Sequence, residues 1–234
     1  MTDRHAANTS NREQLATAWD SFVDQLKVVG HEALESAPNN PDRVDGLRFI
    51  LRQLAYREEQ FIEYPRGQMP EFFDPESPVR KLFADCPDTI YRQFNVTPGG
   101  VYEITGTRGE APYISFTAYR AGVTDRVVAD LHDGQIEIAD DGSFSLTVGG
   151  PEQPTNWLDL GTDGAFVIIR EYCHDRANDV KATFEVEQLS PELGHRPELD
   201  ADTMSTALGI LGIGLKWVND ASVRLSEELR IRPN

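Results

Sequence analysis

From Thr89 to about residue 190, apolar and polar residues alternate with a period of two. This period is typical of β-strands that bury one face. Turn residues separate the runs, and no helical pattern lies between them, which argues against βαβ units and favours an antiparallel sandwich or barrel. The predicted strands are the runs VYEIT, YISFTAY, QIEIA, SFSLTV, AFVIIREY and ATFEVEQL.

Helical patterns flank this region on both sides. A helix is predicted from about residue 11 to 31, with a capping box formed by Ser10 and Glu13. A second helix follows, capped by Asp42, and a third starts near Asp202 or Thr203. The fold class is therefore α+β, an antiparallel β-sandwich flanked by helices. The domains are residues 1–80, a helical region packing on the sheet; 81–195, the sandwich; and 196–234, a C-terminal helix.

Two stretches need separate interpretation. Residues 64–79 contain four prolines and predict an irregular connection. Residues 207–218, ALGILGIGLKWV, are apolar but too short to cross a bilayer. Their three glycines are not spaced as in a phosphate-binding loop, so we interpret them as sites of close helix packing, with a kink as the alternative.

Charge and composition restrict the partners. The chain of 234 residues has 22 Lys+Arg against 39 Asp+Glu, a formal net charge of −17. Such a field repels phosphate backbones and anionic lipids, so neither nucleic acid nor membrane is an expected partner. The N-terminal stretch lacks an apolar segment typical of a secretory signal, and the two cysteines form no CxxC pair. A cytoplasmic location is predicted.

The stretch AFVIIREYCHD changes from apolar to polar along one predicted strand. Alternation places Arg170, Tyr172 and His174 on the same face as Phe166 and Ile168. This face either lines the mouth of a cavity, or it is a strand end that reaches water with the arginine paired to a carboxylate. The sequence leaves both interpretations open.

A second polar cluster, DCPDTIYRQF, precedes the first strand. Asp85 and Asp88 lie three residues apart, followed by Tyr91. The two carboxylates either lie close together, which would raise one pKa, or cap a turn through backbone N–H groups. No HxH, HExxH or CxxC pattern is present, so no metal and no cofactor is predicted.

These segments resemble, in their order, the bacterial domain of unknown function 1214, over about residues 85–190. The resemblance implies a jelly-roll-like β-sandwich with attached helices and no settled reaction. Cys86 stands where the family would have asparagine, and Arg176 where it would have an aromatic residue. The positions that match recurring family features are Asp88, Tyr91, Tyr102, Gly106, Gly109, Asn156, Trp157, Leu158, Arg170 and Asp175.

Three functions are compatible with these observations. The leading hypothesis is a small organic ligand, organic anions included, in a cavity of the sandwich, bound by Arg170, Tyr172, Asp88, Tyr91, Tyr102 and Trp157. The second is a cofactor-free hydrolase, isomerase or lyase that uses the same cavity, with His174, Asp88 and Tyr91 as catalytic candidates. The third is an interaction module, including a homo-oligomer, formed through the helical stripes around Trp19 and Trp217.

Overall fold

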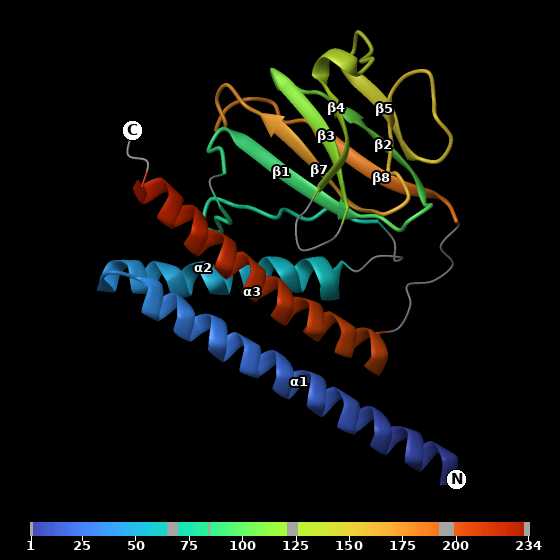
Figure 1. Cartoon of the computed structure of the whole chain (residues 1–234). Coiled ribbons are helices and arrows are strands. Elements are labelled where there is room, and N and C mark those ends of the chain that lie inside the picture. The colour runs from blue at the N-terminus through green and yellow to red at the C-terminus, as the bar shows by residue number, and fades with distance from the viewer. Residues whose placement is uncertain (1, 65–69, 84, 121–125, 192–198, 232–234) are drawn as a thin grey trace. The chain divides into compact units, whose positions relative to one another are not determined.

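The computed structural model describes residues 2–64, 70–83, 85–120, 126–191 and 199–231, and its fold is mixed α+β (Figure 1). The chain divides into two compact units. One combines Met1–Glu63 with Glu198–Asn234, and the other is Tyr64–Pro197. The sequence predicted three successive segments; the structure instead groups the C-terminal helix with the N-terminal helices and divides the chain after Glu63.

The first unit is helical. It consists of α1 (Thr2–Ser36), α2 (Asn40–Glu58), the π-helical turn η1 (Glu59–Glu63) and α3 (Ala201–Ile231). All three long helices contribute to one apolar core, centred on Phe22, Val29, Ile50, Leu211 and Leu215. None of the helices in the described part of the chain has an apolar stretch long enough to cross a membrane.

The predicted helix starts are corrected by the structure. Helix α1 begins at Thr2, so Ser10 lies inside it and forms no capping box. The N-cap of α2 is Asn39, whose side chain accepts a hydrogen bond from the Asp42 amide at 2.9 Å. At the start of α3, the Asp200 side chain accepts a hydrogen bond from the Thr203 amide at 2.8 Å. In both cases the capping side chain lies three residues before the amide it binds, as N-cap geometry requires.

The second unit contains two four-stranded sheets, in which all pairs are antiparallel except β5–β6. The first sheet has the order β1 (Thr89–Asn95), β7 (Gly164–Tyr172), β3 (Tyr113–Arg120), β4 (Arg126–His132). The second has the order β6 (Trp157–Leu158), β5 (Ser143–Gly149), β2 (Val101–Thr107), β8 (Thr183–Ser190). A short 3₁₀ turn, η2 (Asp133–Gln135), follows β4.

One predicted strand, QIEIA, is not a strand. Ile136 is buried and Ile138 packs against the core, which explains the alternating pattern. The backbone there pairs with a side chain instead of a strand: the Glu137 amide donates to Asn156 Oδ1, and Asn156 Nδ2 donates to the Glu137 carbonyl. Alternating burial of side chains therefore does not by itself show that a segment pairs with another strand.

Both sheets contribute to a single apolar core. Three rings from β3, β5 and β8 meet there, Phe116, Phe144 and Phe184, with centroids 5.9–6.0 Å apart. Tyr102 is also inside, and its hydroxyl accepts a hydrogen bond from the Thr97 amide at 2.8 Å. From β7, Val167 and Ile169 face this core.

Glycines permit close contacts at specific points. A Cβ on Gly106 would lie 1.9 Å from the Thr183 carbonyl oxygen on the neighbouring strand. In α3, Gly212 faces Gln25 and Gly214 faces Arg57, as close helix packing predicts. Gly209 faces open space, and α3 continues through all three glycines.

Two substitutions test these glycine contacts. Gly209→Ala should raise the free energy of unfolding by up to about 1 kcal/mol, because alanine restricts the unfolded chain and fits without a clash. Gly106→Ala should lower it by at least about 2 kcal/mol, because its Cβ overlaps the β8 backbone. Urea denaturation of both variants measures these changes. An unchanged free energy of unfolding in Gly106→Ala would contradict the close contact between β2 and β8.

Candidate functional site

The face of the first sheet that points away from the core is polar and aromatic. Strand register aligns Tyr91, Arg170, Ser115 and His132 across the four strands, and the row beside it holds Gln93, Ile168, Thr117 and Asp130. Directly opposed residues share a face. Because Val167 and Ile169 face the core, Arg170 must project from the opposite, outer face.

Neutral groups hold the Arg170 guanidinium. It donates to Thr117 Oγ1 and to the Tyr119 hydroxyl, both at 2.9 Å, and its Cζ lies 5.8 Å from the Tyr91 ring centroid. Thr117 in turn donates to Asp130 Oδ1 at 2.6 Å. No described carboxylate lies within ion-pairing distance of the guanidinium. One interpretation of the sequence was a strand end that reaches water, with Arg170 paired to a carboxylate. No such ion pair is found among the described residues.

The guanidinium has further capacity for hydrogen bonds. Arginine carries five N–H donors in a planar fork, and the two bonds within the described residues use two of them. Thr117 is 4% exposed and Arg170 is half-buried, so the charge lies in a partly desolvated setting. A positive charge with free donors in such a setting is suited to a carboxylate or phosphate.

The irregular segment before β1 brings a carboxyl group to this site. Phe73 and Gln93 exchange backbone hydrogen bonds of 2.9 and 2.8 Å, which fixes the segment antiparallel to the edge of β1. The chain then continues past the level of Tyr91. A turn follows, in which the Ser77 hydroxyl accepts from the Arg80 amide at 3.0 Å. Glu76, immediately before this turn, is thereby held near Tyr91.

Glu76 and Asp85 lie close enough to interact electrostatically, so this part of the site holds two carboxyl groups. Burial and the adjacent Asp85 raise the pKa of Glu76 to about 7, although Lys81 and Arg170 oppose the rise. Burial would also raise the pKa of Asp85, but the Lys81 ammonium, at 2.6 Å, outweighs it and lowers that pKa. The Asp85 side chain is only 7% exposed. The pair is therefore asymmetric, and Glu76 is the member that holds a proton near neutral pH.

Tyr91 lies between the arginine and the carboxyl pair. Its hydroxyl accepts a hydrogen bond from the Cys86 amide at 3.2 Å. Burial raises the pKa of the Tyr91 phenol, and the nearby Glu76 charge adds to this, while the Cys86 amide opposes it. Glu76 Oε2 is buried and has no hydrogen-bond partner within the described residues. We define the Arg170 site as Arg170, Tyr91, Thr117, Tyr119, Glu76 and Asp85.

The structure brings together some of the residues predicted from the sequence. Arg170 and Tyr91 meet, as described. Tyr172 lies on the same face, in edge contact with Tyr113 at 5.3 Å. The carboxyl group that interacts electrostatically with Asp85 is that of Glu76. Asp88 is exposed, and its backbone carbonyl accepts from the Cys173 amide at 2.8 Å.

Three predicted residues lie away from Arg170. His174 is exposed beyond the end of β7. Tyr102 is 1% exposed inside the core. Trp157 belongs to the other sheet and donates its Nε1–H to the Gly149 carbonyl at 3.0 Å. The candidate set therefore does not form one cavity.

Sequence reasoning missed three members of the site. Thr117 and Tyr119 could have been found, because they alternate with Phe116 and Ala118 in the predicted strand YISFTAY and so share its other face. Glu76 could not, because it lies between prolines in a segment without periodicity. In the residues that the structure describes, no three His, Cys, Asp or Glu side chains cluster so as to hold a metal.

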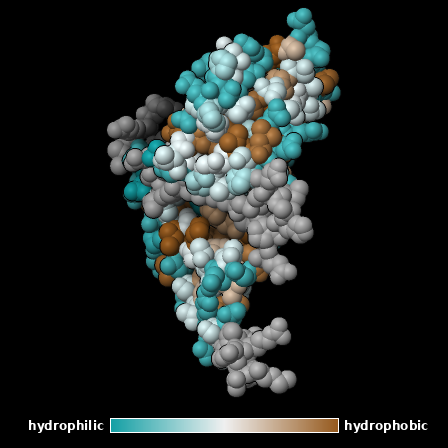
Figure 2. All heavy atoms as spheres, turned by 90° about the vertical axis from the view of Figure 1, so that its right-hand side faces the viewer, coloured by the Kyte–Doolittle hydropathy of each residue, from teal (hydrophilic) through white to brown (hydrophobic). Residues whose placement is uncertain are grey.

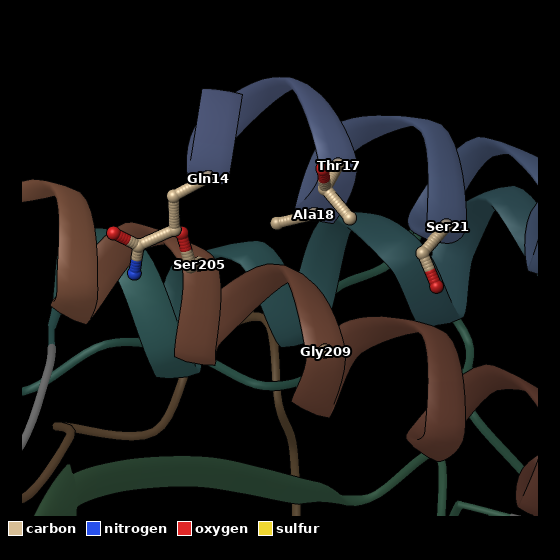
Figure 3. Close-up of a pocket in the computed structure, with 6 residues that line it drawn as sticks. All are labelled: Gln14, Thr17, Ala18, Ser21, Ser205 and Gly209. Atoms are coloured by element: carbon tan, nitrogen blue, oxygen red, sulfur yellow. The ribbon is translucent and has the colours of Figure 1, made fainter. Parts of the chain in front are cut away.

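A shallow groove lies in the helical unit, with a volume of about 480 Å³. Figure 3 shows four lining residues on α1 facing two on α3. They are Gln14, Thr17, Ala18, Ser21, Ser205 and Gly209. These side chains are small or polar, and none of them titrates near neutral pH. The groove therefore offers no acid, base or charge for chemistry.

Comparison with known proteins adds structural relatives. No protein-family model and no curated protein matches the chain. A solved structure of an uncharacterised protein from Burkholderia cenocepacia is similar, with a TM-score of 0.81 and 28% identity over 88% of this chain. The chain spans 59% of that protein's length. A protein from Vibrio parahaemolyticus has a TM-score of 0.37 and 13% identity over 66% of this chain and 47% of its own.

The raised pKa of Glu76 predicts a pH-dependent stability. The native state keeps its proton up to about pH 7, whereas the unfolded chain releases it near 4.5, so stability falls as the pH rises between these values. Glu76→Gln cannot titrate at this position. Its free energy of unfolding relative to that of the wild type should therefore rise by about 2 kcal/mol between pH 4.5 and 8, after allowance for partial exposure. Urea denaturation at several pH values measures the difference. A difference independent of pH would contradict the assigned protonation.

Proposed function

We propose that the protein binds a small organic anion on the outer face of the β1-β7-β3-β4 sheet. The observation that supports this most directly is the half-buried Arg170 guanidinium, which neutral hydroxyls and rings hold in place while no described carboxylate pairs with it. Isolated charges away from water are costly unless they are paired. An anionic ligand supplies the missing partner.

The surroundings favour an organic anion. Tyr91, Tyr113, Tyr119 and Tyr172 lie on the same face as Arg170 and present both ring surfaces and hydroxyl groups. Tyr113 is 38% exposed and stacks on His132 at 6.2 Å. Rings beside a guanidinium suit a molecule with an apolar body and a carboxylate end. The interior between the sheets is occupied by core side chains, so the proposed site is the outer face.

A second candidate function, cofactor-free acid–base catalysis, is favoured by one observation. Glu76 has a pKa of about 7 and lies near Tyr91 and Arg170. A group whose pKa matches the working pH is an effective proton donor and acceptor, and an arginine stabilises developing negative charge. This candidate assigns the proton transfer to Glu76 rather than to His174 or Asp88. Conversion of a bound carboxylate by the wild type, lost in Glu76→Gln, would distinguish catalysis from binding.

We infer that the two sheets form a jelly-roll-like sandwich of the domain of unknown function 1214, and the support is the order of the motifs along residues 85–190. Two free thiols, Cys86 and Cys173, are compatible with the proposed reducing cytoplasm.

An interaction module also remains a proposal. Hydrophobic side chains reach the surface in each unit (Figure 2), and in the helices Trp19 is 56% and Ile213 is 60% exposed. Such residues suit contact with a second copy, and sedimentation would detect it.

The anion-binding proposal predicts the behaviour of two arginine variants. Arg170→Met should weaken binding of benzoate or another monocarboxylate at least about tenfold, because it removes the charged donors and keeps most of the side-chain volume. Arg120→Met is the matched control: it removes a charge from the same sheet, where Arg120 pairs with Asp163 at 3.5 Å.

Calorimetric titration measures both affinities, and circular dichroism verifies the fold. Native mass spectrometry of the protein purified from its own cells identifies any bound anion. Equal affinities of wild type and Arg170→Met would contradict the assignment of this arginine.

A further inference from the structure

The carboxyl pair beside Arg170 suggests how the proposed site is regulated. We propose that the Arg170 site takes up a proton together with its anion, and that Glu76 is the group that holds this proton. The inference rests on the proposed function, since it concerns the same ligand. It makes the protein a proton-coupled binder of monocarboxylates, and it names a residue that the sequence did not indicate.

Backbone contacts on both sides of Glu76 determine its position. The Phe73–Gln93 backbone pair directs the irregular segment along β1, and the Ser77–Arg80 turn ends it. Glu76 thereby lies within electrostatic reach of Asp85, Tyr91 and Arg170. Its unpartnered Oε2 is buried in this cluster, which is an environment that favours the neutral carboxylic acid.

Apart from Glu76 itself, the charges around it leave one positive charge uncompensated, that of Arg170. The groups that face Glu76 are Asp85 and Lys81 from its own segment, Tyr91 from β1 and Arg170 from β7. Lys81 is engaged with Asp85 at 2.6 Å, so that ion pair is close to neutral overall. The Asp130 carboxylate, on β4, reaches Arg170 only through the Thr117 hydroxyl. The net charge felt by an incoming anion therefore depends mainly on Arg170 and on whether Glu76 is protonated.

Binding of an anion and protonation of Glu76 are linked through this charge. A neutral Glu76 leaves the Arg170 charge available to the ligand. An ionised Glu76 repels the ligand and partly cancels the positive potential of Arg170. By thermodynamic linkage, the factor by which protonation of Glu76 strengthens anion binding is also the factor by which the bound anion strengthens proton binding to Glu76. Since its pKa in the free protein is about 7, the effect falls within the physiological range.

Benzoate is the probe for the test, because it remains a monoanion between about pH 5.5 and 8.5. If its binding raises the Glu76 pKa by about one unit, the wild-type affinity should be about fivefold weaker at pH 8 than at pH 6. Calorimetry in buffers of different ionisation enthalpy should show an uptake of about half a proton near pH 7.5. Glu76→Gln should bind benzoate equally across this range, without proton uptake.

Asp88→Asn is the matched control, since it removes an exposed carboxylate from the stretch just before β1. It should keep the wild-type pH dependence. The same pH slope in Glu76→Gln as in the wild type, or no slope in the wild type, would overturn the inference while leaving the proposed anion site intact. Absence of saturable benzoate binding to the wild type at every pH would overturn the proposed function and this inference together.

Discussion

The second unit depends on the two-sided pairing of strand β7. This strand lies between β1 and β3 and pairs antiparallel with both along nearly its whole length. Its odd-numbered residues from Ala165 to Ile169 are almost completely buried, and they fix which face of the sheet meets the core. A slip of one residue would turn Arg170 into that core and Val167 out of it. The burial of the apolar face is therefore what orients the site.

Desolvated ionisable groups in this unit are stabilised in three different ways. Glu171, on the inner face of β7, is 2% exposed and accepts a hydrogen bond from the Ala182 amide at 2.9 Å. Burial raises its pKa, and that bond opposes the rise. Asp85 is balanced by the Lys81 ammonium. Arg170 has neither a described carboxylate nor a backbone partner, and relies on hydroxyl groups and aromatic rings.

The sequence predicted much of the fold and about half of the site, for identifiable reasons. Alternation in AFVIIREY gave the two faces of β7 correctly, because strand geometry is local. It could not say that the outer face, rather than a cavity inside the sheets, carries Arg170, because this depends on which strands pack opposite. The segment QIEIA was wrongly predicted to be a strand. Its side chains are buried alternately, but the Glu137 backbone amide donates to the Asn156 side chain instead of to a neighbouring strand. For Asp85 the sequence left open a pair with Asp88 or a turn cap, and it could not indicate Glu76, which approaches through the irregular, proline-rich segment.

The residues that carried the family resemblance separate into two groups once their contacts are known. Gly106 and Gly109 stand where a side chain would overlap a neighbouring backbone, and Asn156 adopts a positive φ of 48° while its amide donates to the carbonyls of Glu137 and of Ser145 in β5. Asp175 accepts from the amides of the turn that follows it. Backbone geometry alone accounts for these four positions. It does not account for Arg170, where a shorter or uncharged side chain would satisfy the strand and spare the cost of a half-buried cation. Residues that break local rules without a structural gain are expected at functional sites, which is the physical reason why the proposed ligand is assigned to this arginine.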